Sequence, residues 1–77
     1  MKQFVDGKLY DTERSEKVRE LKGADMYRTK KGRWFYCYYG NGAEFIMPAA
    51  EYEAKDAIGN HCGPEMYEKY FGKPEEA

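Results

Sequence analysis

The chain contains few of the residues that usually carry chemistry, with one histidine and two cysteines in 77 residues. Cys37, His61 and Cys62 are the soft metal ligands, and a closed structural zinc site needs four. His61 and Cys62 are neighbours on a short loop, where adjacent side chains usually point apart, so a thiol paired with a base is not favoured either. No glycine loop opens a helix as phosphate-binding motifs do. We therefore expect no metal, no cofactor and no catalytic residue, and we predict that the protein is not an enzyme, a minimal enzyme being the least favoured class.

Long apolar runs are also missing. The first six residues lack the apolar segment of a signal peptide. No stretch approaches the roughly 18 apolar residues that indicate a membrane span. Without a secretory signal, the two cysteines are expected to be free thiols in a reducing compartment. We expect a cytoplasmic protein, without a membrane partner.

A strong net charge is absent as well: the formal net charge of the chain is −1 at pH 7. That value does not favour a general attraction to nucleic acid or to a membrane surface. The charge is nevertheless polarised along the chain. Residues 1–40 carry ten Lys or Arg against six Asp or Glu, whereas residues 41–77 carry three against eight.

Aromatic residues are what the chain has in plenty: eight tyrosines, four phenylalanines and one tryptophan. Large aromatic side chains allow a chain of this length to build one small core, so we expect a single domain over residues 1–77, with residues 73–77 as a frayed tail. Five of the six residues 34–39 are aromatic. In a strand, Trp34, Tyr36 and Tyr38 point to one face and the other three residues to the opposite face. We expect one of these faces to be partly exposed for a partner.

Turn signals define the strands. Asp6-Gly7 predicts a hairpin between residues 2–5 and 8–10. Residues 25–29 and 33–39 flank a Lys-Lys-Gly turn, and residues 44–47 form a closing strand that Pro48 is expected to end. Residues 16–21 remain open, because Val18 and Leu21 have helical spacing in a segment that is short and ends at Gly23; we favour a strand.

Two helices are expected after Pro48. The first presents a stripe of small and apolar residues between Ala50 and Ile58 and ends at Gly59 as a left-handed cap. The second opens at Pro64, a favoured first position, and stops at Gly72. The predicted fold is α+β: a small antiparallel sheet of four to five strands, a hairpin plus a meander, with the two C-terminal helices on one face. Ile58, Met66, Tyr70 and Phe71 are expected to face the sheet.

Several short motifs occur in this order: Asp6-Gly7-Lys8-Leu9-Tyr10-Asp11-Thr12, then Met26-Tyr27-Arg28-Thr29-Lys30-Lys31-Gly32-Arg33-Trp34-Phe35, Ile46-Met47-Pro48 before a glutamate-rich helix, and Tyr70-Phe71-Gly72. In this the chain resembles a diffuse family of short accessory proteins from phages and integrative elements of bacteria. The family has no agreed activity. The resemblance implies a mobile-element setting, in which inhibitors of host defence are common. The chain departs from the family pattern at Ala50, where members often carry a helix-capping Thr.

The basic hairpin supplies the candidate site. Four cations surround the turn, beside Tyr27 and Trp34. The proposed partner-binding residues are Arg28, Lys30, Lys31, Arg33, Trp34, Tyr36 and Tyr38. Charge beside exposed π-faces is typical of single-stranded nucleic-acid binders. A simpler interpretation is that the lysines only keep an exposed turn soluble.

From these features we predict a non-catalytic protein-binding module of a phage or mobile element. It is expected to inhibit a host defence complex by occupying a surface, as anti-CRISPR proteins do. The expected partner is a host protein or nucleoprotein complex. The alternative is a small single-stranded nucleic-acid-binding module, and the polarised charge also suits a head-to-tail homodimer.

Overall fold

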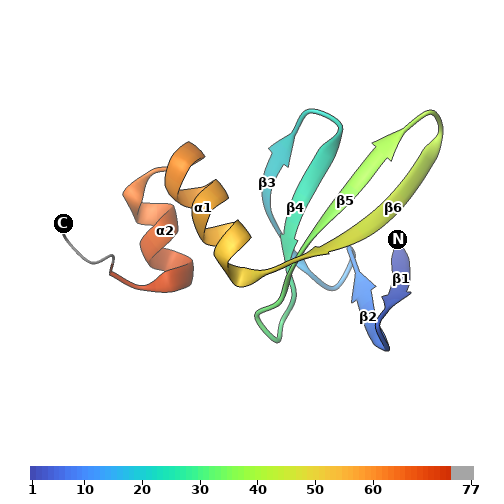
Figure 1. Cartoon of the computed structure of the whole chain (residues 1–77), viewed down its shortest axis with the longest axis horizontal. Helices are drawn as coiled ribbons and strands as arrows, with labels where there is room; N and C mark the ends of the chain where they lie inside the picture. The colour runs from blue at the N-terminus through green and yellow to red at the C-terminus, as the bar shows by residue number, and fades with distance from the viewer. Residues whose placement is uncertain (74–77) are drawn as a thin grey trace.

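Turns divide the chain into six strands and two helices. In the computed structural model, which describes residues 1–73, the elements are β1 (Lys2–Val5), β2 (Lys8–Asp11), β3 (Glu16–Leu21), β4 (Ala24–Arg28), β5 (Trp34–Gly40), β6 (Ala43–Ala49), α1 (Glu51–His61) and α2 (Pro64–Phe71) (Figure 1). The predicted α+β class, with antiparallel strands followed by two helices, is confirmed. Residues 16–21 are a strand, which settles the open alternative. Of the predicted frayed tail, residues 74–77 lie outside the described residues.

The strands form two sheets, and the six described strands exceed the four or five expected. β3, β4, β5 and β6 follow one another as an antiparallel meander, while β1 and β2 form a separate hairpin. The β1–β2 turn places Asp6 and Gly7 at φ of 51° and 74°. These left-handed conformations at both central positions fit the two-residue hairpin turns that match strand twist. The hairpin does not extend the meander and instead covers one of its faces.

The face beneath the hairpin is one core. It is built from Tyr10, Tyr27, Phe35, Cys37 and Ile46, with Met1 and Val5 packed against them. Phe35 has no exposed surface; Tyr27 stacks on it with ring centres 5.1 Å apart, and Tyr10 meets it edge-on at 5.3 Å. Aromatic pairs in these geometries add to the free energy of simple burial. This contact holds β2 against the meander.

The opposite face is a second core, covered by the two helices. Its buried residues are Val18, Met26, Trp34, Ala54 and Ile58. Trp34 is 3% exposed and stacks on Phe71 of α2 at 5.3 Å. As predicted, Ile58, Met66, Tyr70 and Phe71 pack against this face. Figure 1 shows the helices at the left and the β1–β2 hairpin at the lower right, with the meander between them.

Exposure along β5 therefore differs from the prediction. We expected one face of residues 34–39 to be covered and the other to be left partly open. Instead both faces are buried where β5 begins, at Trp34 and Phe35, and both become more exposed toward its end, at Tyr38 and Tyr39. The reason is that the N-terminal hairpin supplies a second cover, and neither cover reaches the far end of the sheet.

Pro48 does not end the meander, and that prediction was wrong. β6 continues to Ala49, with Pro48 opposite Phe35. The backbone N–H and C=O of Ile46 bond to the side chain of Gln3 and so point away from β5. Because this direction alternates along a strand, the nitrogen of Pro48 also points outward, where β5 requires no donor. Edge strands tolerate proline for this reason.

The end of α1 is a second correction. The helix passes through Gly59 and reaches His61, and its C-cap is Cys62 in an extended conformation rather than a left-handed glycine. A β-carbon at Gly59 would lie 3.8 Å from the ring of Tyr67, so the glycine sits at the contact between the helices. The predicted limits of α2 are confirmed: it begins at Pro64 and is capped by Gly72 at φ 80°. Neither described helix is long and apolar enough to cross a membrane.

Candidate functional site: a basic cavity and an aromatic patch

The turn between β4 and β5 displays its lysines on a hydrogen-bonded frame. The N–H of Gly32 donates to the carbonyl of Thr29 at 2.9 Å, and the N–H of Thr29 donates to the carbonyl of Arg33 at 2.7 Å. The N–H of Arg33 also donates to the Thr29 hydroxyl at 3.0 Å. Gly32 has a φ of 85°, which a residue with a side chain adopts only with strain. Lys30 and Lys31 occupy the exposed positions between these bonds.

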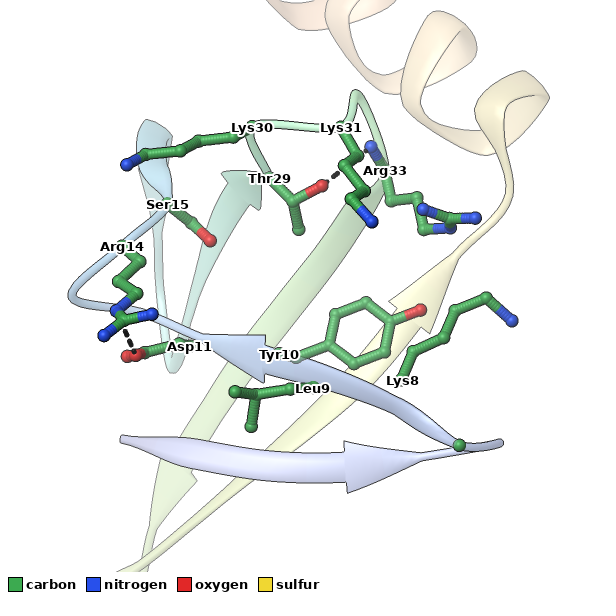
Figure 2. A pocket seen from close by; sticks show the side chains of 11 residues that line it. Lys8, Leu9, Tyr10, Asp11, Arg14, Ser15, Thr29, Lys30, Lys31 and Arg33 are labelled. Carbon is green, nitrogen blue, oxygen red and sulfur yellow. Dashed lines mark hydrogen bonds and ion pairs between the residues drawn. The ribbon is translucent and has the colours of Figure 1, made fainter.

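A cavity of about 400 Å³ lies between this turn and the N-terminal hairpin (Figure 2). Its cations come from three separate segments: Lys8 from β2, Arg14 from the β2–β3 turn, and Lys30, Lys31 and Arg33 from the β4–β5 turn. The lining also includes Leu9, Tyr10, Asp11, Ser15 and Thr29. We call this the basic cavity. Packing of β2 on Phe35 creates it, because that contact brings Lys8 and the turn lysines to the same hollow.

Most of this positive charge is not neutralised locally. Within residues 1–73, Lys8, Lys30, Lys31 and Arg33 form no ion pair, whereas Arg14 approaches the Asp11 carboxylate at 3.7 Å. Asp11 is 5% exposed and also accepts a hydrogen bond from the N–H of Glu13 at 3.0 Å. That bond shapes the turn after β2. One oxygen of the carboxylate is thus engaged in the turn, and the four other cations are exposed to solvent.

Arg28 does not belong to the basic cavity, although the sequence placed it with the turn cations. Its guanidinium lies 5.6 Å from the ring centre of Trp34 and 5.5 Å from that of Tyr70. Cation–π contacts of this kind stabilise packing where the cation is partly removed from water. The residue therefore helps to hold α2 on the sheet. Trp34, beneath it, is buried in the helix-covered core and presents no surface to a partner.

The second surface lies at the far end of the helix-covered face. It consists of Tyr36, Tyr38, Phe45 and Met47, which we call the aromatic patch. Tyr38 and Phe45 are paired across β5 and β6 and stack with ring centres 5.2 Å apart. Phe45 is 48% exposed and Met47 51% exposed, while Tyr36 and Tyr38 are half-buried. The helices end short of these residues, so an apolar surface is left open to solvent.

Polar residues border the aromatic patch near Tyr36. Burial raises the pKa of the Tyr36 hydroxyl, the neighbouring Tyr38 and Glu53 raise it further, and Arg19 opposes them. Glu53 comes from α1 and Arg19 from β3, so charges of both signs adjoin the apolar surface. An apolar centre with a polar rim is the usual composition of a protein–protein interface.

The structure separates the residues that the sequence had grouped together. The basic cavity lies at the start of β5 on the hairpin-covered side, and the aromatic patch lies at its end on the helix-covered side. Arg33 and Tyr38 are five residues apart on an extended strand, about 17 Å at about 3.4 Å per residue. Lys30, Lys31 and Arg33 line the cavity, Tyr36 and Tyr38 belong to the patch, and Arg28 and Trp34 belong to neither.

Sequence reasoning missed Lys8 and Arg14 in the cavity, and Phe45 and Met47 in the patch. The alternation Phe45-Ile46-Met47 was a usable signal, because it places Phe45 and Met47 on one face and buried Ile46 on the other. No comparable signal connected Lys8 with Lys31. Their proximity depends on a contact between distant parts of the chain.

The two cysteines lie apart, as free thiols in different cores. Cys37 is buried beneath the hairpin, and Cys62 is half-buried next to the helix-covered core. Burial raises the pKa of the Cys37 thiol, with Glu44 and Asp25 adding to the effect. His61 is exposed at the end of α1. In the part of the chain that the structure describes, no three His, Cys, Asp or Glu side chains gather as a metal site would require.

Comparison of the chain with protein-family models, with curated proteins and with solved structures finds no match. The site is therefore interpreted from its own geometry.

Proposed function

We propose that this protein is a non-catalytic binding module that acts by occupying a surface of a host protein or nucleoprotein complex. The observation that carries this proposal is the aromatic patch. Exposed apolar surface costs solubility, and monomeric proteins usually keep contiguous patches of it small unless a partner covers them. Tyrosine and other aromatic residues also contribute a large share of binding energy in interfaces.

The setting of this function is a phage or mobile element, and the proposed role within it is inhibition of host defence, as in anti-CRISPR proteins. The support for that setting is the resemblance of the turn and strand motifs to phage accessory proteins. Occupying a surface requires no catalytic residue, only a sheet that presents exposed side chains such as Phe45 and Met47.

Phe45→Ser and Phe4→Ser form a matched pair of variants for testing the patch. Phe45 lies in the aromatic patch, whereas Phe4 is 75% exposed on the outer side of the β1–β2 hairpin, and each substitution removes one exposed strand phenylalanine. The tagged proteins are used to capture partners from lysate of a bacterial host, with and without nuclease. We expect Phe45→Ser to lose a partner that Phe4→Ser retains, in both lysates. Capture that is unaffected by Phe45→Ser would contradict a role for the patch.

Inhibition is measured separately from binding. The wild type and both variants are expressed in bacteria whose CRISPR system restricts a test phage, and the efficiency of plaquing is recorded. We expect wild type and Phe4→Ser to restore plaques and Phe45→Ser to restore fewer. If binding persists while plaquing is never restored, the binding module stands and the defence system is the wrong target.

The turn cations are proposed to steer association. Exposed charges raise on-rates at low salt even where the final contact is modest. Reversing Lys30, Lys31 and Arg33 to Glu is expected to slow association with the captured partner and to flatten or invert its dependence on salt. An unchanged on-rate would leave the aromatic patch as the sole determinant of binding.

The alternative function is binding of single-stranded nucleic acid, and the basic cavity is the observation in its favour. Such modules place stacking aromatics along the same groove as their cations. Here Tyr36 and Tyr38 lie on the other side of the sheet from the cavity, and Trp34 is buried, so this geometry favours the protein-binding proposal. If nuclease treatment of the lysate abolished capture of the partner, binding of nucleic acid would be favoured over binding of a protein.

A further inference from the structure

We propose that the basic cavity is a phosphate-binding site that accepts a phosphorylated ligand of nucleotide size. The cavity holds about 400 Å³, within the range of small-molecule sites and well above the volume of a lone phosphate. Free nucleotides and nucleotide units of a single strand share this chemistry. The inference does not rest on the aromatic patch that carries the proposed function, although Lys30, Lys31 and Arg33 of the cavity are also the cations proposed to steer association.

The lining of the cavity is rich in donors and poor in acceptors. Lys8, Lys31 and Arg33 supply charged donors from two segments that are distant in sequence. The Thr29 hydroxyl accepts the N–H of Arg33, which leaves its own proton free to donate. Asp11, the one carboxylate in the lining, already accepts the N–H of Glu13 and faces Arg14. The other oxygen of Asp11 is buried without a hydrogen-bond partner, so the lining holds one open acceptor among several charged donors. A ligand that fits this lining therefore consists mainly of acceptors.

Phosphate suits the arrangement better than a carboxylate does. Phosphate oxygens point in several directions and accept several charge-assisted hydrogen bonds, while a carboxylate offers two oxygens in one plane. In Figure 2, Lys31 extends from the turn toward the hairpin, while Lys8 and Arg33 lie on the same side of Tyr10. The donors therefore reach the cavity from more than one direction, as a tetrahedral group requires.

Simple solubility does not account for this placement. Lysines that only keep a turn soluble need no cation from another segment beside them, yet Lys8 of β2 lines the same cavity as Lys30 and Lys31. Four cations without ion-pair partners within residues 1–73 gather here in a chain of net charge −1. Clustering like charges disfavours the folded state, and a bound anion would remove that repulsion.

The test measures binding of inorganic tripolyphosphate, ATP and an oligothymidylate without terminal phosphates by calorimetry at low salt. Adenosine and a hexaglutamate peptide serve as ligands without phosphate. We expect tripolyphosphate and ATP to bind and the two phosphate-free ligands not to compete with them. Competition by the oligothymidylate would identify a nucleic-acid backbone as the source of the phosphate, and its absence would identify a free nucleotide or polyphosphate.

Lys8→Gln and Lys22→Gln distinguish binding at a specific site from attraction by the overall charge of the protein. Both lysines are exposed and both substitutions remove one positive charge, but Lys22 lies outside the lining. We expect Lys8→Gln to weaken tripolyphosphate binding about tenfold, as the loss of one charge-assisted hydrogen bond implies, and Lys22→Gln to change it less than twofold. Phe45→Ser is expected to leave this affinity unchanged.

Backbone amide NMR spectra of the isotope-labelled protein show where on the protein tripolyphosphate binds. Adding tripolyphosphate is expected to shift the amide signals of Lys8, Ser15 and Thr29. In the absence of ligand, the spectrum of each variant should match that of the wild type except at residues close to the substitution. Three results would overturn the proposal: equal weakening by Lys8→Gln and Lys22→Gln, hexaglutamate binding as tight as tripolyphosphate, or no binding with no shifts at the cavity.

Discussion

The side chain of Gln3 in β1 bonds to the backbone of Ile46 in β6 through both of its polar atoms. Its carbonyl oxygen accepts the Ile46 N–H at 3.0 Å, and its amide nitrogen donates to the Ile46 carbonyl at 3.4 Å. This pair ties the N-terminal hairpin to the edge of the meander. It also occupies backbone groups that an exposed edge strand would offer to another chain.

Gln3→Ala is therefore expected to destabilise the fold by about 1–2 kcal/mol, because it leaves partly buried backbone groups of Ile46 without partners. Urea unfolding measures this change. Lys2→Ala, at an exposed neighbouring position, should stay within about 0.5 kcal/mol of wild type. Tripolyphosphate binding should weaken in Gln3→Ala as the hairpin loosens. Equal unfolding midpoints for Gln3→Ala and wild type would show that water satisfies Ile46 equally well.

Acid is expected to weaken the attachment of α2 to β3. The Tyr70 hydroxyl donates to the Glu16 carboxylate at 2.6 Å and Lys69 bonds to it at 3.0 Å; these bonds, with the more distant charge of Arg28, hold the pKa of Glu16 below its ordinary value of 4.5. The unfolded chain thus binds a proton here more readily than the folded protein. The stabilisation is complete above pH 4.5 and is lost as the pH falls through the folded pKa.

Urea unfolding between pH 3 and 7 tests this dependence. Wild type should lose stability below pH 4.5 more steeply than Glu16→Gln, which cannot be protonated. The Glu16 side chain is 48% exposed, so solvent screening keeps the difference small. Tyr70→Phe removes the strongest of these bonds and should flatten the profile in part. Parallel pH profiles for wild type and Glu16→Gln would refute this prediction.

Ala50 leaves the start of α1 without a side-chain cap. Its backbone has the extended conformation of a cap residue, at φ −74° and ψ 156°, and its N–H donates to Glu53 at 3.2 Å. Ala50→Thr adds the missing acceptor for the first turn and should stabilise the fold by about 1 kcal/mol. Ala50→Val has the same shape without the hydroxyl and should not. Equal melting temperatures for the two variants would exclude capping as the cause.

The two thiols should differ in reactivity. Alkylation requires the thiolate, and burial both raises the pKa of Cys37 and shields it from reagent. Cys62, half-buried at the end of α1, should react first with iodoacetamide, and Cys37 should react at a rate set by opening of the hairpin-covered core. Peptide mapping by mass spectrometry assigns the two rates. Fast labelling of Cys37 in native buffer would mean that the β1–β2 hairpin opens readily.

Local signals in the sequence were sufficient to predict most of the strands and helices of the fold. Asp6-Gly7 identified the first hairpin because few residue pairs adopt left-handed backbone at both positions of a two-residue turn. Pro64 marked the start of α2 because a missing N–H has no cost at a first helical position. The same local rules failed at Pro48 and Gly59. Which way the Pro48 nitrogen points depends on its partner strand, and the role of Gly59 depends on Tyr67 of the next helix.

The binding surfaces depended on contacts that no local pattern contains. The sequence by itself determined that Lys30 and Lys31 stand on an exposed turn, and that Tyr36 and Tyr38 share a face of one strand. The tertiary structure decided which side chains remain available for a partner. Helix α2 covers Trp34, and Arg28 packs on Tyr70 of that helix, whereas the surface around Phe45, where β5 ends and β6 begins, stays exposed. It also brought Lys8 to the turn lysines, because the pairing of Tyr10 with Phe35 packs β2 onto the meander across 25 residues of chain.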